Sequence, residues 1–227
     1  MTYGLRTQAD FLAQDIAFKG MASEFLVSRK GRSLGRIQLR VPGLHNVYNA
    51  LAATAVGLDL QIDFATIQEA LGEFAGVARR FQILGEPNGI LVVDDYAHHP
   101  AEIQATLNAA KSGFGRNVIA VFQPHRYTRT QALAHEFATA FYQADRLFVT
   151  EIYPASERPI PGVHGGQIAD GVKEHGHKNV TYVPVKEDLV DAVAAVARPG
   201  DIVLIMGAGD IWRIGEEIVR RLEMEGR

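Results

Sequence analysis

The spacing of hydrophobic positions differs between the first third of the chain and the remainder. In the first third, two segments that mix apolar and polar residues, 24–28 and 36–41, flank a turn-forming stretch, Lys30-Gly31-Arg32-Ser33. This pattern predicts a β-hairpin. Residues 11–18 mix apolar and polar side chains and are expected to add further β-structure. Pro42-Gly43 should end this β-region.

Two helices are predicted after the hairpin, because apolar side chains recur at helical spacing over residues 51–58 and 64–74. Asp63 immediately precedes the second segment and is suited to cap its N-terminus. The pattern then changes to short apolar runs that alternate with amphipathic segments. A domain boundary is therefore expected between Gly76 and Phe81.

The second part of the chain has the pattern of repeated strand–helix units. Apolar runs predict strands at 90–93, 118–122, 146–150, 180–183 and 202–206. Helices are predicted from Pro100 and around residues 133–141, 189–193 and 214–222. Such repetition predicts an α/β fold with a mostly parallel sheet covered by helices on both faces. Because ligands bind at the carboxyl ends of the strands in these sheets, the loops there should hold the functional site.

The composition is that of a globular protein and narrows the range of partners. Hydrophobic residues make up 47% and charged residues 22% of the 227 positions, which argues against disorder and allows two small domains. A net charge of −3 without a long basic run argues against nucleic acid and membranes as partners. The sequence has no cysteine, no visible secretory signal and no long apolar run, so a cytoplasmic location is expected.

The loop expected after residue 93 carries the densest group of reactive side chains, Asp94-Asp95-Tyr96-Ala97-His98-His99-Pro100. Carboxylates suit ribose hydroxyls or a metal, and imidazoles suit proton transfer or contact with an anion. Helix capping by solvated polar residues is the alternative. We favour that alternative for a single histidine but not for the whole cluster at a strand end.

The loop after residue 122 contains Gln123-Pro124-His125-Arg126-Tyr127-Thr128-Arg129. If the helix has already begun, Arg126 and Arg129 share a face, and their guanidinium groups could clamp a carboxylate or phosphate. Two exposed arginines in surface ion pairs are the alternative. The proline-containing loop 151–162 fits a pocket wall and a plain surface loop equally well.

Other motifs are weaker or missing. Gly207-Ala208-Gly209-Asp210-Ile211-Trp212 fails as a dinucleotide fingerprint because Trp212 replaces the third glycine, which argues against a dehydrogenase. Asn46 and Asn49 could contact a purine edge, with helix capping by Asn46 as the alternative. Arg79-Arg80 could reach a phosphate or remain solvated. The sequence contains no P-loop, nucleophile elbow or His-Glu-x-x-His metal motif.

Taken in order, these segments resemble the Mur ligase family. The matching stretches span most of the chain: Pro42-Gly43-x-His45-Asn46-Val47-x-Asn49, Gly76-Val77-x-Arg79-Arg80-Phe81, residues 94–100, residues 122–130, Tyr153-Pro154-Ala155-x-Glu157 and residues 207–211. The resemblance implies that residues 1–77 are the C-terminal part of a P-loop-type central ATP-binding domain, contributing a β-hairpin and helices. It implies that residues 78–227 are a complete Rossmann-like C-terminal domain.

The resemblance also implies an activity in peptidoglycan synthesis. The implied reaction is ATP-dependent joining of L-alanine to the lactyl carboxylate of UDP-N-acetylmuramate through an acyl phosphate. The UDP-sugar domain, the P-loop and the Mg²⁺ ligands would lie before Met1, so no metal ligand is expected here and the isolated chain should be inactive. A non-catalytic nucleotide or amino-acid binding module and the related murein-tripeptide recycling ligase are the alternatives.

The family's functional residues can be carried over to matching positions. Asn46 and Asn49 would contact adenine, Asp95 the ribose and Arg80 the ATP phosphates. An arginine would bind the alanine carboxylate. The residues that would line the L-alanine and acyl-phosphate pocket are Tyr96, His98, His125, Arg126 and Arg129. Catalytic roles are expected for His98, His125 and Arg126.

Overall fold

Two units make up the chain, and the computed structural model describes residues 1–6 and 8–225 of it. The first unit comprises Met1–Val77 with Ser112–Gly115, and the second comprises Ala78–Lys111 with the chain from Arg116 onward. Each unit has its own cluster of buried hydrophobic side chains. The two units are therefore described separately.

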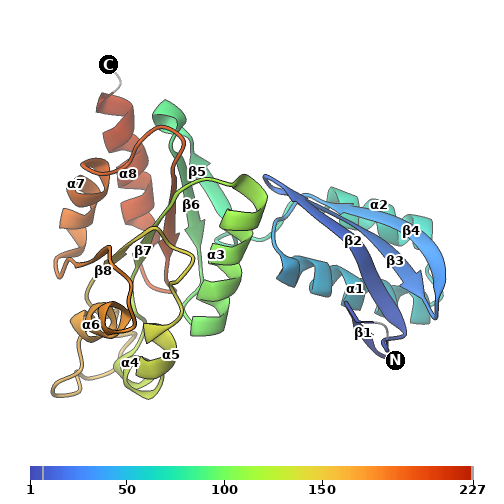
Figure 1. Ribbon diagram of the computed structural model, residues 1–227, viewed down its shortest axis with the longest axis horizontal. Coiled ribbons are helices and arrows are strands. Elements are labelled where there is room, and N and C mark those ends of the chain that lie inside the picture. Colours follow the sequence, from blue (N-terminus) through green and yellow to red (C-terminus); the bar gives the residue numbers. More distant parts are fainter. Residues whose placement is uncertain (7, 226–227) are drawn as a thin grey trace. The chain divides into compact units, whose positions relative to one another are not determined.

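A four-stranded sheet forms the first unit together with two helices (Figure 1). The strands follow the order of the sequence: β1 (Tyr3–Gly4), β2 (Phe11–Lys19), β3 (Ala22–Arg29) and β4 (Arg32–Leu39). β2, β3 and β4 are antiparallel, which confirms the predicted hairpin. Lys30 and Gly31, with φ of 47° and 79°, form its two-residue turn. Two positive φ angles match the right-handed twist of the flanking strands.

The helices of the first unit are α1 (Leu44–Asp59) and α2 (Phe64–Glu73). Side chains of α1, such as Leu51, are buried in one cluster with Phe25 and Ile37 of the sheet. Asp63 caps α2 as predicted, because its carboxylate accepts the Thr66 N–H at 2.9 Å. The residue before α1 is Gly43, so the alternative in which Asn46 caps that helix is wrong.

The second unit is built on a six-stranded sheet in the order β5-β6-β10-β7-β8-β9. Its strands are β5 (Gln82–Gly85), β6 (Leu91–Asp95), β7 (Val118–Phe122), β8 (Arg146–Val149), β9 (Val180–Tyr182) and β10 (Ile202–Met206). β5 runs antiparallel to β6, and the other neighbours are parallel. The predicted mostly parallel sheet is confirmed. The pattern does not predict β5, because this edge strand is short and partly exposed.

Helices cover both faces of this sheet, as predicted. They are α3 (Pro100–Phe114), α4 (Tyr127–Ala132), α5 (Ala134–Ala138), α6 (Gly166–Glu174), α7 (Leu189–Ala194) and α8 (Trp212–Glu225), with 3₁₀ turns η1 (Pro87–Gly89) and η2 (Lys186–Asp188). The prediction of one helix over 133–141 is wrong, since α5 ends at Ala138 and Phe141 lies beyond it. α6 was not predicted because two glycines, Gly166 and Gly171, weaken its helical pattern.

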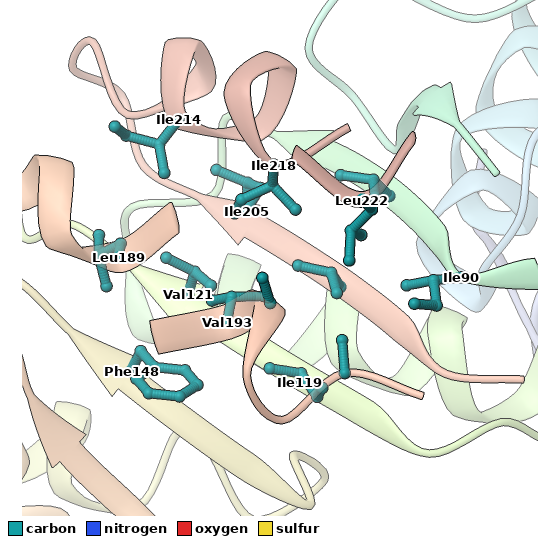
Figure 2. Close-up of a cluster of buried hydrophobic side chains, with 14 of the residues drawn as sticks. Ile90, Ile119, Val121, Phe148, Leu189, Val193, Ile205, Ile214, Ile218 and Leu222 are labelled. Carbon is teal, nitrogen blue, oxygen red and sulfur yellow. The ribbon is translucent and has the colours of Figure 1, made fainter. Parts of the chain in front are cut away.

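The order of the strands decides which helices lie on which face. The chain advances through β7, β8 and β9 in one direction and then returns to β10, which lies between β6 and β7. Right-handed crossovers therefore place α7 on the face opposite to α3. Figure 2 shows Leu189 of α7 and Ile218 of α8 pointing toward Val121 and Ile205 of the sheet. On the other face, the Phe122 ring lies 5.2 Å from that of Phe141.

Candidate functional site

Asp94 and Asp95 are the last two residues of β6, which corrects the expected strand end at residue 93. They pair with Ile205 and Met206 of β10 in a parallel register. Only 1% and 4% of their surfaces are exposed. Burial raises the pKa of both carboxyl groups, and the Arg79 guanidinium partly opposes this rise at Asp94.

Arg79 connects three segments at the carboxyl edge of the sheet. Its Nε donates to Asp94 Oδ2 at 3.0 Å, and its terminal nitrogens donate to the carbonyls of Gly207 and Gly209 at 2.6 and 3.2 Å. Arg80 is more exposed, at 48% of its side chain, and its Nη1 lies 3.6 Å from Glu102 Oε1. Of the two arginines, Arg79 thus has a structural role, and Arg80 is the one that a ligand can reach.

Backbone N–H groups of nearby residues bind both carboxylate oxygens of Asp95. Its Oδ2 accepts the Phe81 N–H and its Oδ1 accepts the Ala97 N–H, both at 2.8 Å. Each carboxylate oxygen has a second lone pair. The Thr106 side chain also hydrogen-bonds to Asp95 and acts to lower its pKa, so a ribose hydroxyl could bind Asp95 only through a lone pair that these three bonds leave open.

The loop after β10 needs glycines because other residues pack closely against it. A Cβ at Gly209 would lie 2.6 Å from Tyr153 Cγ and 2.7 Å from Gln123 Oε1, and Gly207 has a φ of 152°. These close contacts are a sufficient reason for glycine at both positions, with no ligand required. They also bring Gln123 and Tyr153, from two other strand ends, against the same loop.

His98 is oriented by hydrogen bonds on its Nδ1 side. Nδ1 lies 2.9 Å from the Tyr96 carbonyl and 3.3 Å from Glu102 Oε2. Both of these oxygens are acceptors, so Nδ1 carries a proton and the lone pair of the neutral ring is on Nε2. Glu102 Oε2 also accepts the backbone N–H groups of His98 and His99 at 3.0 and 3.2 Å.

Glu102 is a further residue of the candidate site that the sequence pattern did not single out. It is in the first turn of α3 and reaches back to the N–H groups before the helix, the arrangement of a capping box. Burial acts to raise the pKa of Glu102, but those N–H bonds and the nearby charges of His98 and Arg80 lower it. A glutamate two residues after Pro100 was the available signal, because it occupies the third helical position.

His125 differs from His98 in that a hydrogen-bond donor, not an acceptor, faces its Nδ1. Arg129 Nη1 lies 3.2 Å from His125 Nδ1 and can only donate, so this nitrogen accepts and the proton of the neutral ring is on Nε2. Burial and the charges of Arg129, His98 and Arg126 lower the pKa of His125. The Tyr153 ring stacks on His125 with centroids 5.5 Å apart, and the His98 ring is 5.8 Å away.

Arg126 and Arg129 do not both belong to the helix. Arg126 is the residue before α4 and has a φ of 74°, so the expectation of two arginines on one helix face is wrong for this pair. The Arg126 side chain is 47% exposed and its Nη1 lies 3.5 Å from Glu157 Oε1. Both side chains nevertheless come from the same short segment, and both charges act on His125.

The structure brings most predicted site residues together at one edge of the second unit. Tyr96 lies near the guanidinium groups of Arg79 and Arg80, 5.0 and 5.5 Å from its ring centroid, and its own ring is 5.3 Å from His98. Asn46 and Asn49 belong to the first unit. There the Asn46 amide donates to the Pro42 carbonyl at 2.7 Å, and the Asn49 amide donates to Asn46 Oδ1 at 3.3 Å.

Neither a metal-binding group of three or more side chains nor a membrane-spanning helix occurs within residues 1–6 and 8–225. These residues contain no group of three or more His, Cys, Asp or Glu side chains placed to hold a metal ion. None of their helices is both long and apolar enough to cross a membrane.

Family models match both units of the chain. The model described as "Mur ligase, glutamate ligase domain" matches residues 79–209, and the model described as "Mur ligase middle domain" matches residues 1–57. The first of these alone covers more than half of the chain. The boundary between the two units, after Val77, lies in the stretch between the two matches.

Two of the most similar relatives share one name. The chain is 52% identical over 223 residues to UDP-N-acetylmuramate–L-alanine ligase of Trichlorobacter lovleyi, a match that covers 98% of this chain and 49% of the relative. It is 51% identical over 227 residues to the ligase of that name from Salinibacter ruber, covering 100% and 48%. The chain therefore spans about half the length of the curated relatives it matches.

Solved structures show the same likeness. The crystal structure of UDP-N-acetylmuramate–alanine ligase from Thermotoga maritima matches with a TM-score of 0.83 and 32% identity, over 99% of this chain and 48% of that one. A murein peptide ligase from Psychrobacter arcticus matches with a TM-score of 0.67 and 26% identity, over 98% and 46%.

Proposed function

The chain belongs to the Mur ligase family, and on this premise we propose that it supplies the amino-acid side of an ATP-dependent ligase. The proposed reaction joins L-alanine to the lactyl carboxylate of UDP-N-acetylmuramate in peptidoglycan synthesis. The names of the relatives at 50% identity and above support this substrate pair. Because the reaction consumes ATP, we place it in the cytoplasm.

The proposed domain assignment follows the two units. We assign residues 1–77 to the C-terminal part of the central ATP-binding domain and residues 78–227 to the C-terminal domain that receives the amino acid. The ranges of the two family models support this assignment. Since the sequence contains no P-loop, we expect the isolated chain to have no catalytic activity.

One observation carries the proposal: two imidazoles with opposite tautomers lie next to two arginines at the carboxyl edge of a parallel sheet. His98 presents an Nε2 lone pair. This lone pair can take the proton that the ammonium group of L-alanine must lose before its nitrogen can attack. His125 presents an Nε2–H, which can donate to the oxygen that gains negative charge as the acyl group is attacked.

The arginines are assigned to the carboxylate of L-alanine and to the acyl phosphate. A guanidinium group offers a planar fork of N–H donors that matches either anion. Arg126 is exposed and opposite Glu157, and Arg129 is held against His125. Tyr96 would form the neighbouring wall, since its ring lies 5.3 Å from that of His98.

The ATP contacts are assigned to four residues of this chain. ATP would supply the phosphoryl group that activates the lactyl carboxylate, and Mg²⁺ would balance its charge. Asn46 and Asn49 have amide groups of the kind that read an adenine edge. Asp95 keeps a lone pair for a ribose hydroxyl beside its bonds to Phe81, Ala97 and Thr106, and Arg80 is exposed enough to reach a phosphate. We expect the Mg²⁺ ligands outside this chain.

Substitution of the arginines tests the proposal in a full-length ligase that contains this chain. We expect Arg126→Ala and Arg129→Ala each to raise the KM for L-alanine by about tenfold or more, because a charged hydrogen bond to the carboxylate is lost. Arg116→Ala is the matched control, since Arg116 pairs with Glu86 on the surface and should leave the KM unchanged. Unchanged alanine kinetics in both site variants would rule out the assignment.

The related murein-tripeptide ligase activity is the second candidate, and it is favoured by the likeness to the Psychrobacter arcticus structure. The two activities differ in the nucleophile, which is free L-alanine in one and a peptide in the other. Steady-state rates of a full-length ligase that contains this chain, measured with L-alanine and with the tripeptide, separate them. We expect turnover with L-alanine alone.

A further inference from the structure

Two histidines outside the candidate site lie next to each other on the surface of the second unit. His135 is the second residue of α5, and His175 is the residue that follows α6. Their ring centroids are 5.6 Å apart, and the ring planes are inclined by 68°. Both residues are exposed, and neither has a role in the ligase reaction proposed above. Two imidazole groups from different helices thus meet where solvent and ions can reach them.

The backbone that carries the two histidines is held by close packing. α5 and α6 lie side by side (Figure 1), and a Cβ added at Gly171 of α6 would be only 3.3 Å from the Cβ of Ala138 in α5. Gly176, which follows His175, has a φ of 96°, and its N–H donates to the Lys173 carbonyl at 2.9 Å. This bond fixes the end of α6. Little ordering of the backbone is therefore needed to bring the two rings together.

One hydrogen bond fixes the tautomer of His175. Its Nδ1 lies 2.8 Å from the Gly171 carbonyl oxygen, which can only accept, so Nδ1 carries the proton of the neutral ring. The lone pair is then on Nε2. Metal-binding imidazoles usually have this arrangement, in which one ring nitrogen donates to a carbonyl or carboxylate and the other binds the ion. His175 is therefore prepared to bind an ion through Nε2.

His135 has both ring nitrogens available for a ligand. Within residues 1–6 and 8–225, its ring contacts the ring of His175 and has no hydrogen-bond partner. The neighbouring His177 differs in this respect. Its Nε2 lies 2.8 Å from the Ala144 carbonyl, and its Nδ1 accepts the Asn179 N–H at 3.3 Å. His135 and His175 thus keep a nitrogen lone pair each, whereas both nitrogens of His177 are occupied.

The separation of the two rings fits one shared ion. A bond from a metal ion to an imidazole nitrogen is about 2.0–2.1 Å long, so two rings on one tetrahedral ion have centroids about 5 Å apart. The observed 5.6 Å is within a small side-chain rotation of this value. Imidazole nitrogen suits Zn²⁺, Ni²⁺ and Cu²⁺, whereas Mg²⁺ and Ca²⁺ prefer oxygen ligands. The pair therefore selects for transition-metal ions.

We propose that His135 and His175 form a two-histidine site for a divalent transition-metal ion of the class that includes Zn²⁺ and Ni²⁺. The ion binds His175 Nε2 and one ring nitrogen of His135, and water occupies its other positions. Because the two ligands are far apart in the sequence, the site exists only in the folded chain, and binding ties α5 to α6. The site is separate from the arginine pair and does not depend on the proposed ligase reaction.

Titration of the isotope-labelled chain with Ni²⁺ tests this site. Ni²⁺ is paramagnetic, so the NMR signals of amides near the bound ion broaden. We expect residues 134–136 and 174–176 to broaden together below equimolar Ni²⁺, and an excess of Zn²⁺ to restore their signals. The same excess of Mg²⁺ should not restore them, because Mg²⁺ prefers oxygen. Zn²⁺ should also shift the ring nitrogen signals of both histidines.

Single substitutions show whether both rings bind the same ion. His135→Gln and His175→Gln should each weaken Ni²⁺ binding by about tenfold or more, since even a partner outside the coordination shell contributes about tenfold to hundredfold. His164→Gln is the matched control, because His164 is an exposed histidine of the same unit whose ring neighbour, at 6.3 Å, is Tyr182. It should leave the affinity unchanged. The amide spectrum of each variant verifies that it is folded.

Two outcomes would overturn the two-histidine site. One is the absence of broadening around His135 and His175, including the case in which only His98 and His125 respond. The other is a response of one ring alone, seen as a Zn²⁺-induced shift at a single histidine or as an unchanged affinity in either glutamine variant. The ring signals need no variant, so they decide the question even if a variant misfolds. The ligase proposal is tested separately, by the alanine kinetics of the arginine variants.

Discussion

At the scale of single residues, the two imidazoles of the site differ in what their Nδ1 atoms face. His98 Nδ1 faces a carbonyl and a carboxylate, and His125 Nδ1 faces a guanidinium group. Each contact fixes one tautomer of the neutral ring. At Nε2, His98 thus offers a lone pair and His125 offers an N–H, although both residues are histidines.

The lowered pKa of His125 gives a pH dependence of stability. Below a pH of about 6.5 the unfolded chain takes up a proton at this residue. The folded chain resists it, because of burial and the charges of Arg129, His98 and Arg126. The stability that depends on a neutral His125 is therefore fully present above that pH. The free energy of unfolding decreases as the pH falls toward the folded-state pKa of His125.

We expect the variant His125→Gln to lose less stability than the native chain between about pH 7 and pH 5. Urea unfolding at a series of pH values measures the difference, and the other titrating groups are common to both proteins. A parallel loss of stability in the two proteins would show that His125 does not resist protonation.

At the scale of elements, close backbone approaches position the loops at the carboxyl edge. Gly165, which precedes α6, has an ordinary φ of −60°, so it is not needed for a left-handed backbone. A Cβ there would lie 2.1 Å from the Thr150 carbonyl oxygen. The glycine is required because the start of α6 packs directly on the end of β8, where its N–H donates to Glu151.

Gly165→Ala should therefore lower the free energy of unfolding by about 1–3 kcal/mol, the usual effect of overpacking. Gly72→Ala is the control, because a Cβ in that helix meets its nearest neighbour at an ordinary 3.6 Å. Chemical denaturation of both variants measures the contrast. Equal stability of Gly165→Ala and the native chain would mean that β8 and α6 can separate without cost.

At the scale of the whole molecule, the residues proposed to bind ATP are divided between the two units. Asn46 and Asn49 belong to the first unit, and Arg80 and Asp95 belong to the second. The sequence has no Gly-x-x-x-x-Gly-Lys-[Ser/Thr] motif. A P-loop supplies the backbone N–H groups that hold the phosphates, and adenine and ribose contacts alone do not replace them.

We expect the isolated chain to bind ATP weakly or not at all in calorimetric titrations. The physical reason is that the proposed contacts reach the adenosine end and leave the triphosphate charge mostly unmatched. A full-length ligase that contains the chain serves as the positive control. Micromolar affinity of the isolated chain would contradict the assignment of phosphate binding to residues outside it.

The sequence by itself determined the fold class, the strands of the parallel sheet and the loops that carry the candidate site. These features follow from hydrophobic spacing and from residue types within short segments, which are local properties of the chain. The capping of α2 by Asp63 and the Lys30-Gly31 turn were predictable for the same reason.

The tertiary structure alone decided which site residues from different segments contact one another. Arg79 and Gly207 are 128 positions apart, and nothing in either segment indicates that a guanidinium group binds that carbonyl. The approach of the His98 ring to the His125 ring, with centroids 5.8 Å apart, also depends on segments that are distant in the sequence. Side-chain partners at the edge of a sheet are set by strand order, and strand order brings together residues that no local pattern relates.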